Sequence, residues 1–141
     1  MAFSEPHVGD VVLCRVPFAT GGAVHPCVVT KVHPKSAGHV VQVDIVLSSS
    51  QISKLYLGDC VIAPYVNAEE FACSGLSRPS RFKTDTILRT LPYDSRNFLV
   101  PANKRFGDTP KIGRFTASAI ARLVEGYRQL MQKQRTRCPS S

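Results

Sequence analysis

Three short runs of apolar and β-branched residues, separated by turn-forming residues, fill most of the first fifty positions of the chain. They are VVLCRVPF at 11–18, PCVVTKV at 26–32 and VVQVDIVL at 40–47, with the loops ATGGA and HPKSAGH between them. Side chains in such runs alternate between two faces, which is the period of a β-strand. Three strands joined by short polar loops predict a sheet at the start of the fold.

The second half of the chain changes from strand patterns to a helical one. Residues 60–66 form another short apolar run, and residues 77–92 predict a longer strand with charged residues on its outer face. Residues 93–113 lack any period and contain glycine and proline, so we expect an irregular loop there. Thr116 is the expected N-cap of a helix over residues 117–134. Its apolar stripe has helical spacing and consists of Ile120, Leu123, Val124, Tyr127, Leu130 and Met131.

Several short strands followed by one amphipathic helix predict a mainly β fold with some α. We expect a small, strongly bent antiparallel sheet or barrel that the C-terminal helix covers. A chain of 141 residues has the size of one ordinary domain. The prediction is therefore a single domain over residues 1–135, with a frayed tail over residues 136–141.

Composition places this domain among cytoplasmic proteins. No apolar run approaches the ~20 residues that cross a bilayer, and the start of the chain lacks the pattern of a signal peptide. The five cysteines include no CxxC pair, so neither a disulfide framework nor a zinc ribbon is indicated. The four histidines stand singly, without metal-ligand spacing. We expect a cytoplasmic protein with no membrane contact and no metal.

The charge of the chain is strongly positive. Eighteen Lys and Arg residues against ten Asp and Glu give a net charge of +8, and the excess lies largely after residue 76. A basic surface attracts phosphate backbones and releases their counterions, so nucleic acid is the first partner to consider. The alternative is a basic face that only contacts solvent.

The order of five segments resembles the PemK/MazF family, the toxins of bacterial toxin-antitoxin modules. These segments are GDVVLCRVPF, HPCVVTKV, DIVLSSSQ, GLSRPSRFKTDTILRT and IGRFTASAIARL, and together they span roughly residues 8–130. The resemblance implies an SH3-like β-barrel of the CcdB/MazF plasmid-maintenance type. It also implies a homodimeric endoribonuclease that cuts single-stranded RNA without a metal or other cofactor. A partner antitoxin would silence it by laying an acidic segment over the active cleft.

The resemblance also assigns site residues. The family arginine at the head of the second strand corresponds to His25, and the Thr or Ser after the third strand corresponds to Ser49, with Ser48 and Ser50 as the alternatives one residue away. It places the loop aromatic, a candidate for stacking a base, on Phe18. The polar pair of the late strand corresponds to Asp85 and Thr86.

Metal-independent RNA cleavage lets the ribose 2′-hydroxyl attack its own phosphate, which calls for proton transfer and for donors to the charged intermediate. A histidine lacks the fixed bidentate charge of an arginine, yet near neutral pH it is well suited to moving a proton. We therefore expect His25 as acid or base and Ser49 as a phosphate donor, with charge supplied by Arg78, Arg81 or Lys83.

Two other functions stay open. A protein of this fold that has lost cleavage would bind nucleic acid only, and a sister branch of toxins acts on a protein target such as a DNA topoisomerase. His25 and Cys27 also invite a Cys-His nucleophile interpretation, but the sequence offers no orienting third group. Phe82, between Arg81 and Lys83, could stack a base, and we interpret it as a core residue instead.

Overall fold

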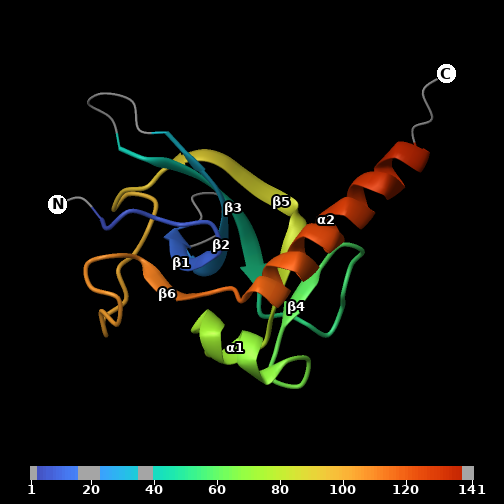
Figure 1. Cartoon of the computed structure of the whole chain (residues 1–141), viewed down its shortest axis with the longest axis horizontal. Helices are drawn as coiled ribbons and strands as arrows, with labels where there is room; N and C mark the ends of the chain where they lie inside the picture. Colours follow the sequence, from blue (N-terminus) through green and yellow to red (C-terminus); the bar gives the residue numbers. More distant parts are fainter. Residues whose placement is uncertain (1–2, 16–22, 35–39, 138–141) are drawn as a thin grey trace.

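A computed structural model describes residues 3–15, 23–34 and 40–137 of the chain. Over these residues the fold consists of a six-stranded sheet and two helices (Figure 1). The strands are β1 (Asp10–Arg15), β2 (Val24–His33), β3 (Gln42–Ser49), β4 (Cys60–Ile62), β5 (Ser80–Pro92) and β6 (Lys111–Arg114). The helices are α1 (Ala68–Ser74) and α2 (Ala117–Arg137).

The sheet has the order β4-β5-β3-β2-β1-β6, and every neighbouring pair is antiparallel. It curls into a half-barrel, and register shifts interrupt the pairing of β3 with β5. Extra residues of this kind increase the twist of a strand and bend it. The expectation of a mainly β fold with a strongly bent antiparallel sheet and a C-terminal helix is confirmed.

Both faces of the curled sheet are buried, because alternate side chains enter two separate cores. Val11, Val28 and Phe82 belong to the core beneath α2, which contributes Ala119 and Leu123. The other core contains Val12, Cys14, Cys27, Val29 and Ile45, and it is closed by Tyr93 and Phe98. Phe82 is fully buried, so its interpretation as a core residue is confirmed.

Two elements were not predicted. The prediction of an irregular loop over residues 93–113 is wrong at its C-terminal end, because β6 begins at Lys111 and pairs with β1. The short helix α1 lies between β4 and β5; Asn67 caps its start by accepting a hydrogen bond from the Glu70 amide, and Gly75 ends it with a φ of 73°. An Asn N-cap and a left-handed Gly C-cap are the usual boundaries of a helix.

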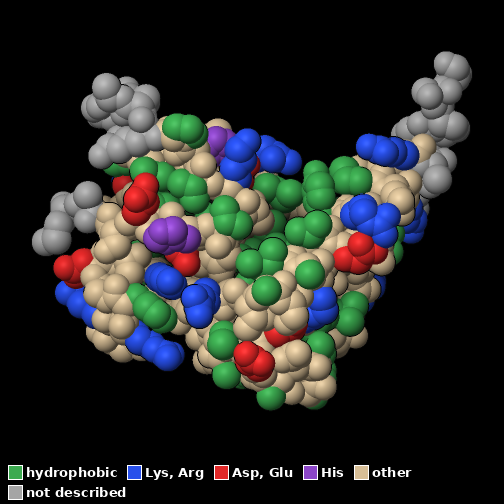
Figure 2. Space-filling model, in the orientation of Figure 1, with side chains coloured by type: hydrophobic (Ala, Val, Ile, Leu, Met, Phe, Trp, Pro, Cys, Tyr) green, Lys and Arg blue, Asp and Glu red, His purple; other side chains and the backbone are tan. Residues whose placement is uncertain are grey.

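Helix α2 begins as predicted and packs over only part of its length. Thr116 Oγ1 accepts a hydrogen bond from the Ala119 amide at 3.2 Å, which confirms the N-cap. Leu123 is buried, whereas Val124 is 60% exposed and Tyr127 36% exposed. The C-terminal half of α2 extends beyond the sheet (Figure 1). Apolar side chains gather where the helix leaves the sheet (Figure 2). No helix of the described chain is long and apolar enough to cross a membrane.

A buried ion pair joins the two helices. Glu70 of α1 is almost fully buried and accepts hydrogen bonds from the Arg122 guanidinium and the Ser118 hydroxyl of α2. The guanidinium holds the pKa of the Glu70 carboxyl below its usual range, even though burial opposes this. The carboxylate therefore stays ionised and fastens α1 beneath the start of α2.

Candidate functional site

The antiparallel order brings the start of β2, the end of β3 and the start of β5 to the same end of the sheet. Cys27 pairs with Leu47, and this register, continued by two residues, sets His25 across from Ser49. Ser49 in turn pairs with Arg81. Paired residues on neighbouring strands hold their Cβ atoms about 4.5–5.5 Å apart on one face. His25, Ser49 and Arg81, which we call the His25 row, therefore lie side by side.

A pocket of about 410 Å³ opens at the same end of the sheet. Its walls come from β1, β2, β6, the end of β3 and the turn between α1 and β5. The lining residues that carry polar side chains are His25, Ser48, Ser50, Ser77, Arg78 and Ser80. His25 lines this pocket and also belongs to the His25 row. Ser48 and Ser80 of the pocket have the strand parity of one sheet face, and Ser49 and Arg81 of the row have that of the other, so the pocket and the row meet at His25.

The three consecutive serines have different surroundings. Ser48 is buried and its hydroxyl donates a hydrogen bond of 2.5 Å to the carbonyl of Pro26 on β2. Ser49 is half-buried, and its Oγ accepts a hydrogen bond from the Gln51 amide at 3.2 Å. Ser50 is exposed and lines the pocket, whose lining does not include Ser49. Among the three hydroxyls, the pocket thus favours Ser50 as a donor to a bound anion.

Arg81 is held by the protein itself. Its Nε donates to the Gln51 carbonyl at 2.9 Å, and its Nη1 lies 3.2 Å from Asp59 Oδ2. The side chains of Arg81 and Asp59 are only 13% and 5% exposed, so this pair offsets most of the arginine charge. Arg81 fixes the loop between β3 and β4, and the prediction that it also binds RNA stays a prediction.

The other two predicted cations differ in accessibility. Arg78 is exposed and lines the pocket, and among the described residues its guanidinium has no acidic partner. Lys83 is half-buried on β5, and its charge acts on the Cys27 thiol. Arg78 therefore supplies the fixed positive charge of the pocket lining.

The remaining residues from the sequence lie outside this pocket. Asp85 and Thr86 are further along β5, where the Thr86 hydroxyl donates to Asp85 Oδ1 at 2.9 Å, and neither is part of the pocket lining. Phe18 lies outside the described residues. Its role as a base-stacking residue stays a prediction.

The contacts of Cys27 argue against a Cys-His nucleophile. The Cys27 thiol is fully buried and points to the His25 carbonyl, at 3.4 Å. Burial raises its pKa well above the usual range, helped by a hydrogen bond with the Cys14 thiol. A thiol that stays protonated and inaccessible is a poor nucleophile.

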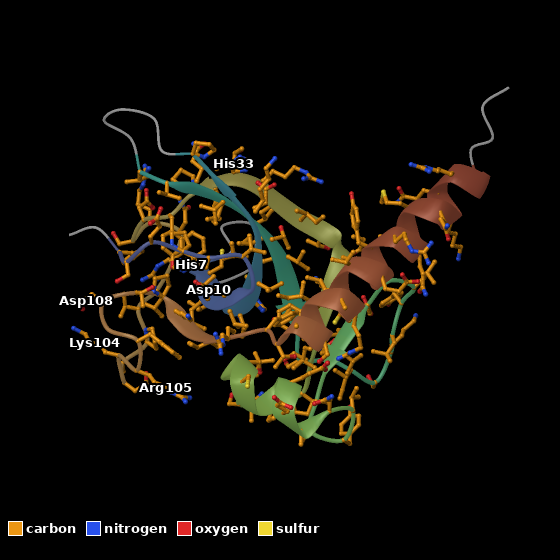
Figure 3. All side chains as sticks on the ribbon, viewed as in Figure 1. His7, Asp10, His33, Lys104, Arg105 and Asp108 are labelled. Atoms are coloured by element: carbon orange, nitrogen blue, oxygen red, sulfur yellow. The ribbon has the colours of Figure 1, made fainter. Side chains whose placement is uncertain are left out.

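The other described histidines, His7 and His33, are not part of the pocket lining. Figure 3 shows His7 and Asp10 side by side, and His33 well apart from them. His33 Nε2 lies 2.7 Å from Asp44 Oδ1, at the end of β2 opposite to His25. Within the described ranges no three His, Cys, Asp or Glu side chains are grouped as metal ligands.

Comparisons with known proteins do not place the chain in a family. No protein-family profile matches the sequence. No curated protein matches it significantly. The chemistry of the pocket and the order of the sequence motifs are therefore the basis for any functional assignment.

Proposed function

We propose that this chain is a metal-independent endoribonuclease of the PemK/MazF type that cuts single-stranded RNA. The observation that carries the proposal is the meeting of His25, Ser50 and Arg78 in one pocket, with Ser49 next to His25 in the His25 row. These residues lie in three segments that are distant in the sequence. They supply a group that moves protons, a hydroxyl donor and a fixed positive charge, which are the groups that phosphodiester cleavage needs.

The proposed reaction uses the pocket as follows. Arg78 and the Ser50 hydroxyl bind the non-bridging oxygens of the scissile phosphate and stabilise the added negative charge. His25 removes the proton of the 2′-hydroxyl as its oxygen bonds to phosphorus. The bond to the 5′-oxygen breaks, and that oxygen takes a proton from water at the open side of the pocket. The products are a 2′,3′-cyclic phosphate and a 5′-hydroxyl end.

The remaining parts of the proposal come from the resemblance to the toxin family. The curled sheet would be an SH3-like barrel of the CcdB/MazF type, and the protein would act in the cytoplasm as a homodimer. A small acidic antitoxin would cover the pocket. Sedimentation of the purified chain tests the dimer, and a reading frame for a small acidic protein beside this one would support the antitoxin.

The test of the proposed function is cleavage of a mixed-sequence single-stranded RNA in the presence of a chelator. We expect cleavage without added metal, with cyclic phosphate ends, and none when the RNA carries 2′-methoxy groups. His25→Ala should reduce the rate by about 10²-fold or more, the usual contribution of a general acid or base. Cleavage by His25→Ala at the rate of the native chain would overturn the role of His25.

The matched control is His33→Ala, which removes a histidine from the far end of the same strand. It should cleave RNA at the native rate as long as the fold is retained.

A second candidate function is RNA binding without cleavage. It is favoured by the pairing of Arg81 with Asp59. This pairing leaves less positive charge at the site to stabilise the charged intermediate of cleavage. Salt-sensitive binding of single-stranded RNA with no cleavage in any buffer would select this function. Binding to a purified topoisomerase, with no effect on RNA, would instead point to a protein target.

A further inference from the structure

The loop between β3 and β4 presents Tyr56 in a fixed position. The Tyr56 amide donates to Asp59 Oδ2 at 2.9 Å, and the Asp59 amide donates back to the Tyr56 carbonyl at 3.1 Å. Gly58 closes this turn with a φ of 88°. Tyr56 is nevertheless 52% exposed as a residue. The turn therefore holds an aromatic ring in solvent, an arrangement that loses little conformational entropy when a ligand binds.

Arg81 connects this ring to the candidate site. Its guanidinium lies 5.1 Å from the centre of the Tyr56 ring, while its Nε binds the carbonyl of Gln51, the residue after Ser50. Arg81 also pairs with Ser49 in the His25 row. Arg81 thus contacts the Tyr56 ring on one side, and on the other it adjoins the His25 row and the rim of the pocket at Ser50 and Gln51.

The free charge around the ring is positive. Lys54 Nζ lies 5.4 Å from the centre of the Tyr56 ring, and the lysine is exposed and has no acidic partner among the described residues. The carboxylate of this cluster, Asp59, is buried against Arg81. An exposed aromatic ring beside an exposed ammonium suits a nucleotide, because the base stacks on the ring and its phosphate contacts the cation.

We propose that Tyr56 is a stacking platform for the base of a nucleotide next to the scissile phosphate, and that Lys54 binds the phosphate of that nucleotide. This inference rests on the proposed function, because it needs single-stranded RNA in the pocket. The RNA would leave the pocket past Ser50, cross the end of β3 and reach Tyr56 beside Arg81. Stacking accepts every base, so the platform adds affinity without selecting a sequence.

The chain offers a natural control in Phe106. This ring is also exposed and also lies near two cations, with Arg105 at 5.5 Å and Lys111 at 5.0 Å from its centre. It belongs to the loop before β6, at the opposite edge of the sheet from the loop before β4. Figure 2 shows basic side chains gathered over β6 and this loop. If an exposed ring near cations were enough to bind RNA, Phe106 and Tyr56 would contribute equally. We expect only Tyr56 to contribute, because only Tyr56 lies beside the candidate site.

The first experiment measures binding of a labelled 2′-methoxy RNA of about twelve nucleotides and mixed sequence, which the protein cannot cut. Tyr56→Ala should weaken binding by about tenfold to a hundredfold, the loss expected for one stacked base. Tyr56→Phe keeps the ring and should stay within about twofold of the native chain, as should Phe106→Ala.

The second experiment uses the absence of tryptophan from the sequence. Tyr56→Trp introduces a single tryptophan, whose fluorescence should be quenched when the same RNA binds. Phe106→Trp should not be quenched. Because the tryptophan keeps a ring on the turn, this measurement does not depend on the fold of the alanine variant.

The outcomes separate the two proposals. Native-like binding by Tyr56→Ala together with an unquenched Tyr56→Trp would overturn the platform, while cleavage by the native chain would leave the proposed function intact. A native chain that neither binds nor cuts RNA would overturn both. Equal losses for Tyr56→Ala and Phe106→Ala would indicate a general basic surface and would also contradict the platform.

Discussion

At the residue scale, hydroxyl groups that lie close together in the sequence have different tasks because their hydrogen-bond partners differ. Ser48 is buried against the Pro26 carbonyl, while Ser50 is free in the pocket. We expect Ser48→Ala to lower the free energy of unfolding by about 1 kcal/mol, since a buried carbonyl loses its donor. Urea denaturation measures this value.

Ser50→Ala serves as the comparison. Its stability should stay within about 0.5 kcal/mol of the native chain, because no protein hydrogen bond of the described structure is lost. Its cleavage rate should fall. A destabilised Ser50→Ala beside an unchanged Ser48→Ala would contradict the assignment of the two hydroxyls.

Asp44 is a buried carboxylate whose titration should be visible in stability. It accepts hydrogen bonds from His33 Nε2 at 2.7 Å and from the Thr90 amide at 2.8 Å, and Arg89 lies 3.5 Å away. Burial alone would raise the pKa of Asp44, but these hydrogen bonds and charges outweigh it and lower the pKa. Thr90 has a φ of 53°, which is unusual for a β-branched residue, and Asp44 holds its amide.

A lowered pKa means that the folded chain binds the Asp44 proton less readily than the unfolded chain. The stabilisation is therefore complete above the unfolded pKa and is lost as the pH falls through the folded pKa. Asp44→Asn should cost about 1–3 kcal/mol at neutral pH, and this difference from the native chain should shrink between about pH 5 and pH 2. Unfolding of the native chain and of Asp44→Asn across this pH range measures the difference.

Among the site residues, those with distinctive chemistry could be predicted from the sequence. His25 was named because it takes the position of the family arginine, and Arg78 because it is one of the basic residues of the late strand segment; both line the pocket. The choice among Ser48, Ser49 and Ser50 depends on strand parity at the last residue of β3, which the sequence leaves uncertain by one position. Tyr56 was missed because its setting depends on Arg81, which is distant in the sequence.

At the element scale, the longer strands and α2 were predictable because each carries its own period. Helix α1 has seven residues, too few for a clear apolar stripe, although Asn67 followed by Glu70 and then Gly75 marks both of its ends. Strand β6 has four residues and one of them is glycine. It is a strand because the exposed edge of β1 pairs with it, which is a tertiary cause that local propensity does not contain.

The contact of α1 with β6 depends on Gly75. A Cβ atom there would lie 1.8 Å from the Ile112 carbonyl oxygen, and φ is also positive. Gly75→Ala should therefore cost about 2–4 kcal/mol, because the two backbones must separate. It should also impair cleavage, since Gly75 and Ile112 both line the pocket.

Gly107 gives the matched control for this prediction. Its φ is 83°, but a Cβ atom would meet nothing within 4 Å. Gly107→Ala should thus show only the cost of the left-handed backbone, about 1–2 kcal/mol. Thermal or urea unfolding of both variants separates the cost of the left-handed backbone from the cost of the clash with Ile112. Equal losses of stability in the two variants would rule out close backbone approach as the role of Gly75.

At the scale of the whole molecule, seven of the ten acidic residues pair with a lysine or arginine of the same chain. They are Asp10, Asp44, Asp59, Asp94, Asp108, Glu70 and Glu125. The excess of +8 therefore includes Lys54, Arg78 and Lys83 around the candidate site, which have no acidic partner among the residues that the structure describes. These three are the cations that a phosphate backbone at the site would meet.

This partition of charge predicts the salt dependence of RNA binding. Each phosphate contact of a single strand contributes about 0.7 to the slope of log affinity against log salt, so three contacts give a slope of about −2. Arg78→Ala should reduce the magnitude of this slope by about 0.7. Tyr56→Ala should weaken RNA binding without changing the slope. Arg128→Ala, which removes a cation paired with Glu125, should also leave the slope unchanged. Titrations between low and high salt decide this, and a slope that Arg78→Ala does not alter would exclude Arg78 as a phosphate contact.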